Sequence, residues 1–83
     1  MNTAYLLLAR FEKPTVHLTD ICEEFFGCAK KTAMEKAKAG TLPVPAFRLE
    51  DNKRAPWLIN INDLASLIDR QREQAQREWT GDL

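Results

Sequence analysis

One arc of the segment between residues 29 and 39 carries most of the side chains that could do chemistry. A helix turns by about 100° per residue, which places the alanines at 29, 33 and 37 on one side. The opposite arc then carries Lys30, Lys31, Met34, Glu35 and Lys38. Lysines neutralise phosphates and release their counterions, and side chains at the start of a helix can reach base edges in a major groove. A lysine-rich helix face is usually no more than a solvated face, but the glycine turn and the wing described below favour binding of double-stranded DNA by this one.

Three residues of this segment leave alternatives open. Met34 is apolar on a polar arc, so it could contact a thymine methyl group or turn back to the core. Thr32 could donate to a phosphate or be a packed helix residue. Lys36 lies nearer the packed side and is the weaker candidate for a ligand contact.

A second group of polar side chains follows, between two short apolar runs at residues 46–49 and 56–60. The runs read as strands around a charged tip, which is typical of a wing. Candidate contacts to the DNA backbone or minor groove are Arg48, Asn52, Lys53 and Arg54. Arg48 could instead pair with Glu50 or Asp51, and Trp57 is expected in the core under the wing.

Helical segments surround these two groups. The sequence predicts helices over residues 3–11, capped by Asn2 or Thr3, and over residues 20–26, capped by Thr19 or Asp20. Residues 16–18 read as an extended link. Gly27 is expected to form a tight turn into the helix at 29–39, and Gly40 is expected to end that helix. A final helix follows, is capped by Asn60 or Asn62, and extends to about residue 79.

This order predicts a mainly α fold with a small β-hairpin wing, a winged helix-turn-helix. Residues 1–83 are expected to form a single DNA-binding domain with its core at about 16–69. The second helix of the helix-turn-helix motif would be the recognition helix.

Charge is distributed unevenly along a chain that is neutral overall. Residues 29–54 hold seven basic and three acidic residues, a net charge of +4, and the remainder carries −4. A neutral chain can therefore present one positive face.

Several functional classes are not expected. The longest apolar run is too short to span a membrane, and no export signal precedes it. Cys22 and Cys28 are expected as reduced thiols, and with a single histidine no metal site or cofactor is predicted. The chain lacks a phosphate-binding glycine loop and a nucleophilic triad, so no enzyme activity is predicted.

The stretch from Gly27 to Pro43 resembles the G-x-S-x-x-T…G-x-[FL]-P spacing of small prophage regulators and excisionases, which have MerR-like winged-helix domains. Ala29 stands where that pattern has serine, which removes one polar contact. A closer likeness covers nearly the whole chain: its opening at residues 2–11, the segment 22–26, Ala39-Gly40, Leu49-Glu50 and the helix at 63–69 are similar to the pyocin activator protein family. This resemblance implies a bacterial or prophage DNA-binding regulator of transcription.

Two alternatives to a transcription regulator stay open. One is a phage excisionase that binds attachment-site DNA and directs an integrase in DNA recombination, and the other is a protein interaction module without DNA affinity. Expected partners are double-stranded DNA, a second copy of the chain as a homodimer or cooperative array, and an integrase or RNA polymerase. The expected location is the bacterial cytoplasm, at the nucleoid.

The end of the final helix leaves its own question open. Trp79 is a large apolar residue after a polar stretch, which indicates an interface. Residues 71–79 could pair with another copy, pack back on Leu6 and Leu7, or fray.

Overall fold

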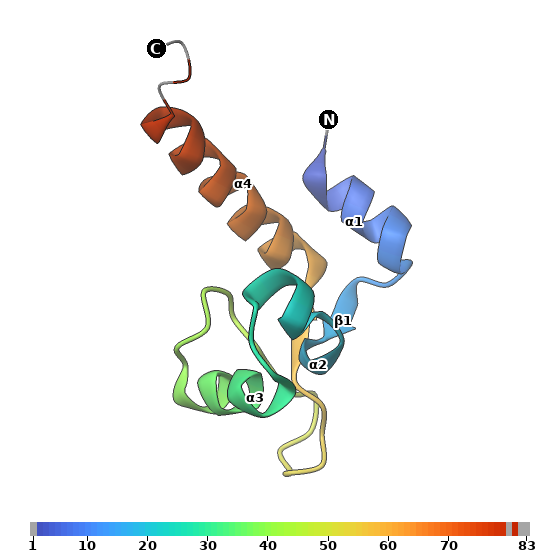
Figure 1. The fold of residues 1–83 in the computed structure, drawn as a ribbon. Helices are drawn as coiled ribbons and strands as arrows, with labels where there is room; N and C mark the ends of the chain where they lie inside the picture. The colour runs from blue at the N-terminus through green and yellow to red at the C-terminus, as the bar shows by residue number, and fades with distance from the viewer. Residues whose placement is uncertain (1, 80, 82–83) are drawn as a thin grey trace.

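A computed structural model describes residues 2–79 and residue 81 (Figure 1). The elements follow in the order α1 (Thr3–Phe11), β1 (Thr15–His17), α2 (Leu18–Ile21), the π-helix η1 (Cys22–Phe26), α3 (Lys30–Ala39), β2 (Leu58–Asn60) and α4 (Ile61–Glu78). This part of the chain is mainly helical, with two antiparallel strands and a loop between α3 and β2. The predicted winged helix-turn-helix-like fold is confirmed.

Helix α1 begins and ends where local signals place it. The Asn2 side chain accepts a hydrogen bond from the Tyr5 backbone N–H at 3.2 Å, so Asn2 rather than Thr3 is the cap. The helix ends at Glu12, whose backbone is left-handed with φ 58°, two residues before Pro14. Leu7 is the buried residue of this helix.

The first helix of the helix-turn-helix motif starts earlier than predicted. It begins at Leu18, with His17 as N-cap and no side-chain hydrogen bond to the cap position, so the predicted caps at Thr19 and Asp20 are wrong. β1 carries the chain directly into the helix, and the burial of Leu18 and Ile21 holds this turn in place.

Both glycine predictions are confirmed. Gly27 ends η1 with φ 65° and Gly40 ends α3 with φ 73°, the left-handed region where a β-carbon is unfavourable. The Gly40 N–H donates to the carbonyls of Lys36 and Ala37, which closes the last turn of α3.

The sheet pairs segments that are far apart in sequence. β1 runs antiparallel to β2, with Val16 opposite Ile59 and His17 opposite Leu58. On its other side Leu58 exchanges two backbone hydrogen bonds with Phe47, at 2.7 and 3.0 Å. The predicted extended link at 16–18 is therefore a paired strand up to His17, and the predicted strand at 46–49 is reduced to a single bridge at the base of the wing.

The core lies where α2, η1, α3, the sheet and the first half of α4 meet. Its fully buried large side chains are Leu18, Ile21, Cys22, Ile59 and Leu64. The Asn60 side chain caps α4 by accepting a hydrogen bond from the Asn62 backbone N–H at 2.8 Å. Asn60 is one of the two residues predicted as this cap. α4 then extends well past the body, which contributes to a long dimension of 52 Å against 26 and 16 Å (Figure 1).

Candidate nucleic-acid interface

Helix α3 presents its cationic arc to solvent. Ala33 and Ala37 are buried, and their small side chains let the α3 backbone approach the core closely. The predicted contact residues of the helix are all exposed: Lys30, Lys31, Thr32, Met34, Glu35 and Lys38. Met34 does not turn back to the core: 41% of the residue is exposed.

The first turn of α3 favours an anionic ligand. Its N-cap is Ala29, which makes no side-chain hydrogen bond, and the turn contains no acidic residue. Lys30 and Lys31 therefore stand at the positive end of the helix dipole, where an anion is stabilised and two cations are not. A phosphate at this end would meet backbone N–H groups that have no partner within the helix.

The tip of the wing is shaped by Asn52. Its side-chain oxygen accepts from the backbone N–H groups of Arg54, at 2.8 Å, and Ala55, at 2.9 Å. Such an Asx turn fixes the tip while the side chains of Lys53 and Arg54 remain exposed. Asn52 thus has a structural role in addition to any contact made by its amide nitrogen.

Arg48 does not form the ion pair that the sequence allowed. Its guanidinium carbon lies 4.3 Å from the centroid of the Trp57 ring, and its Nε atom is buried without a hydrogen-bond partner. Within the described residues neither Glu50 nor Asp51 forms a salt bridge with it. Arg48 therefore joins the two arms of the wing by a cation–π contact. Trp57 itself is partly buried and packs against the edge of the core.

The fold brings the two predicted groups to one end of the molecule. In Figure 1, α3 and the wing loop before β2 lie at the lower end, away from the start of α1 and the end of α4. Lys36 is also exposed, but it lies beside Phe26 and Leu42 at a groove next to α4. This position agrees with the prediction from helical spacing that Lys36 is a weaker candidate for contacting a ligand.

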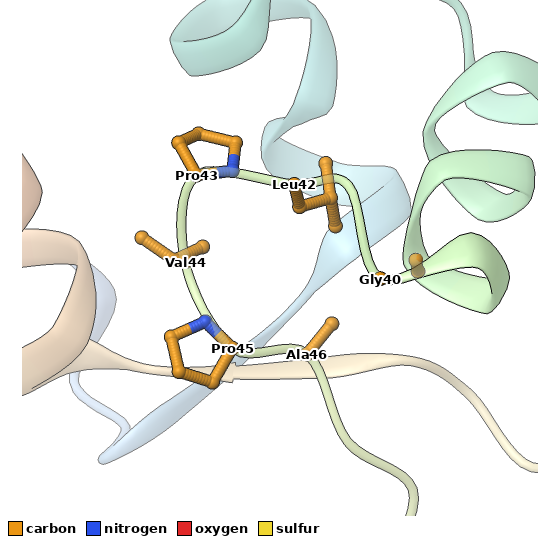
Figure 2. Close-up of a pocket in the computed structure, with 7 residues that line it drawn as sticks. Gly40, Leu42, Pro43, Val44, Pro45 and Ala46 are labelled. Carbon is orange, nitrogen blue, oxygen red and sulfur yellow. The ribbon is translucent and has the colours of Figure 1, made fainter.

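Sequence reasoning missed a hollow after α3. Figure 2 shows the chain from Gly40 to Ala46 curving around it, with Leu42, Val44 and both prolines on the loop. Its volume is about 400 Å³, and Ala37 completes a lining without any ionisable side chain. The two prolines of the loop are the signal in the sequence, because they keep the backbone from continuing as helix.

An ion pair joins α1 to η1 on another part of the surface. The Arg10 guanidinium donates to both carboxylate oxygens of Glu24, at 2.5 and 2.6 Å, and lies over the rings of Phe11 and Phe25. These hydrogen bonds lower the pKa of Glu24 and raise that of Arg10. The pair fastens α1 to the helix-turn-helix motif.

Two further observations concern the described residues. None of their helices has the length and apolar character needed to cross a bilayer. Cys22 and Cys28 are free thiols, buried and partly buried respectively.

Comparison with known proteins identifies the family. No curated protein and no solved structure matches the chain significantly. A family model described as pyocin activator protein PrtN matches residues 3–75, from the first residue of α1 into the distal half of α4. This match covers nearly the whole described chain and agrees with the likeness noted in the sequence: the protein belongs to the pyocin activator protein family.

Proposed function

We propose that this protein is a sequence-specific double-stranded DNA-binding regulator of transcription, which reads the major groove with α3. The observation that carries the proposal is the exposed arc of α3. It bears Lys31 and Lys38 on the side of the second helix of a helix-turn-helix that faces away from the buried Ala33 and Ala37, with Lys30 exposed at the first position of the helix.

Membership of the pyocin activator family indicates a prophage-related transcription regulator. It gives no support to the excisionase alternative. A binding protein of this kind needs no catalytic group.

Each part of the interface has its own role in the proposal. The lysines at the start of α3 bind phosphates, and Met34, Glu35 and Lys38 face the base edges. Met34 offers its thioether to a thymine methyl group. Lys53 and Arg54 on the wing contact the flanking backbone or minor groove, while Arg48 and Asn52 hold the wing in shape.

The first test is reversal of charge at the start of α3. We expect Lys30→Glu with Lys31→Glu to abolish binding while the fold stays intact, because both side chains are exposed and make no hydrogen bond or ion pair with a described residue. Binding is measured by mobility shift, and the fold by circular dichroism. The matched control is Arg70→Glu with Arg77→Glu, both on α4, whose distal end lies away from α3 and the wing (Figure 1), and this variant should retain binding. Retained affinity in the Lys30 and Lys31 variant would contradict the assignment of α3.

The second test identifies the target by DNase footprinting around the protein's own gene and any neighbouring attachment site. Protection over a promoter supports the proposal. Protection of phased repeats beside an attachment site would instead identify an excisionase. Absence of protection at low salt would leave the interaction module as the function.

A further inference from the structure

The two cysteines of the chain lie on either side of the glycine turn that leads into α3. Cys22 is the first residue of η1, and Cys28 is the first residue after Gly27. The sequence contains no other cysteine. Both are free thiols, and neither has a part in the proposed interface with DNA.

Backbone hydrogen bonds hold these two residues close to each other. The N–H groups of Gly27 and Cys28 both donate to the Cys22 carbonyl, the second at 3.3 Å. With standard bond lengths, the second bond keeps the α-carbons of the two cysteines within about 7 Å of each other. Cysteines further apart than about 7 Å cannot be bridged without movement of the backbone. The turn therefore meets this condition for a disulfide.

The pattern of the hydrogen bonds also favours contact between the two side chains. A bond from the second residue after a helix back to a carbonyl of its last turn is typical of the Schellman motif, in which the side chains at the two ends frequently meet. Here those positions are Cys22 and Cys28, with the left-handed Gly27 between them. Both cysteines accordingly share one apolar region, Cys22 in the core and Cys28 packed against it.

The two thiols differ in their access to solvent. Cys22 is fully buried, and its thiol donates a weak hydrogen bond to the Thr19 carbonyl at 3.8 Å. Cys28 is partly exposed and lies outside any helix or strand. A single buried cysteine acts as a small apolar side chain. An accessible cysteine with a second thiol at the same turn is instead the arrangement of a redox-sensitive pair.

We propose that Cys22 and Cys28 form a modification site, at which a peroxide converts the two thiols into a disulfide across the turn. The Cys28 sulfur attacks the peroxide ROOH and breaks its O–O bond, which gives a sulfenic acid at Cys28 and releases ROH. The Cys22 sulfur then attacks the Cys28 sulfur, so that the S–S bond forms and the hydroxyl leaves as water with the Cys22 proton. The two thiols are oxidised, and the peroxide is reduced to an alcohol and water.

The disulfide acts on the start of α3, because no linker separates the two. Ala29 directly follows Cys28 and is the N-cap of α3, and Lys30 is the first helical residue. The disulfide holds the two β-carbons about 4 Å apart, and it takes the Cys22 sulfur away from the Thr19 carbonyl. We expect the first turn of α3 to shift against η1 and DNA binding to weaken. This consequence alone rests on the proposed function.

The first measurement follows the disulfide without DNA. The folded, reduced full chain is treated with hydrogen peroxide, and its intact mass should fall by two hydrogen atoms without covalent dimerisation. Cleavage of the product after Glu23 or Glu24 separates the two cysteines along the chain, so their fragments should stay joined until a reductant is added. An unchanged mass, or added oxygen at Cys28 with Cys22 still a free thiol, would overturn the proposal.

Single variants test the role of each thiol. Cys28→Ser should keep the fold, since residue 28 is partly exposed, and peroxide should then leave Cys22 as a free thiol. Cys22→Ala should accumulate a sulfenic acid at Cys28, which dimedone traps; a dimedone adduct at Cys22 in Cys28→Ser would contradict the order of the steps. Circular dichroism verifies the fold of both variants. If the core variant Cys22→Ala does not fold, the mass measurement and Cys28→Ser decide.

A displaced thiol tests the geometry of the turn. Cys28→Ser combined with Ala29→Cys moves the accessible thiol one residue along the chain, to a position without a backbone hydrogen bond to Cys22. This variant should form the disulfide more slowly than the wild type. Equal rates would show that the turn does not prepare the pair.

Mobility shifts with the reduced and the oxidised protein measure the consequence for DNA. Affinity should fall by about fivefold or more on oxidation and return on reduction with dithiothreitol. Cys28→Ser should bind equally before and after peroxide, which controls for oxidation of the exposed Met34. Equal affinity of the two wild-type forms would refute the effect on α3. A reduced protein that binds no DNA would contradict the proposed function instead, while the mass measurement still decides the disulfide.

Discussion

Two arginines contact aromatic rings in this protein, and each one holds two segments of the chain together. Arg10 lies over Phe11 and Phe25 while it binds Glu24, which ties α1 to η1. Arg48 lies over Trp57 and ties one arm of the wing to the other. The planar guanidinium suits both positions, because it can stack on a ring while its N–H groups point outward, which an ammonium group cannot do.

The Arg10–Glu24 pair makes stability depend on pH in the acid range. Its hydrogen bonds lower the pKa of Glu24 from the ordinary value of 4.5 in the folded state, so the pair stabilises the fold above that pH. This contribution disappears as the pH falls through the lowered pKa. We therefore expect Glu24→Gln to melt below the wild type at neutral pH and to match it in strong acid.

Thermal melts from neutral to strongly acidic pH measure this difference, which is small because both side chains are about half exposed. Glu23→Gln is the control, since Glu23 is exposed and forms no salt bridge with a described residue. A constant gap between Glu24→Gln and the wild type across the whole pH range would contradict the role of the pair.

Single residues also show what the sequence can and cannot reveal about the candidate site. The exposure of Lys31 and Lys38 follows from helical spacing, because Ala33 and Ala37 on the other side face the core. Spacing alone does not give the exposure of Lys30, which lies on the alanine side at the first position of the helix, or that of Ala29, which is the N-cap. The position of Arg48 does not follow, since acidic neighbours in the sequence and an aromatic ring across the wing compete for the same cation. The backbone bridge between Phe47 and Leu58 places their neighbours Arg48 and Trp57 side by side, and this pairing is not visible in the sequence.

At the scale of elements, the left-handed glycine at the turn determines the angle between η1 and α3. Gly27 has φ 65°, and a β-carbon at this position would meet no atom within 4 Å. A larger residue at this position would therefore destabilise the fold through its backbone conformation and not through steric clashes. We expect Gly27→Ala to lower the free energy of unfolding by about 1–2 kcal/mol.

Chemical denaturation measures this decrease. The matched variant is Gly27→Asn, which should be less destabilised, because asparagine adopts the left-handed conformation more readily than alanine. Equal destabilisation of the two variants would show that the turn depends on something other than its φ angle.

Elements with local signals can be predicted from the sequence, and those with distant partners cannot. The predicted bounds of α1 are confirmed, and α3 begins one residue later than expected, because caps and glycines act within a turn of the helix. The sequence predicts only a link at β1, since its partner β2 lies more than forty residues away. η1 departs from the α-helix expected there, and both Phe25 and Phe26 pack against the core.

At the scale of the whole molecule, separation of charge matters more than net charge. The segment 29–54 carries +4 and forms the end of the molecule with α3 and the wing, whereas the remainder carries −4 (Figure 1). DNA binding through this end should weaken steeply with salt. We expect Lys53→Ala with Arg54→Ala to reduce the salt slope by about one for each phosphate that the wing no longer neutralises, with similar effects on all DNA sequences.

Titration of binding at several salt concentrations, on target and unrelated DNA, measures that slope. Arg77→Ala removes a charge from the distal part of α4 and should leave the slope unchanged (Figure 1). A wing variant with the wild-type slope would show that the wing does not touch the DNA backbone.

The junction between β2 and α4 has a mechanical consequence. Asn60 is both the last residue of β2 and the N-cap of α4, so no loop separates the returning arm of the wing from the longest helix. Because Ile59 and Ile61 on either side of Asn60 are buried in the core, the packing of β2 also fixes the direction in which α4 leaves the sheet.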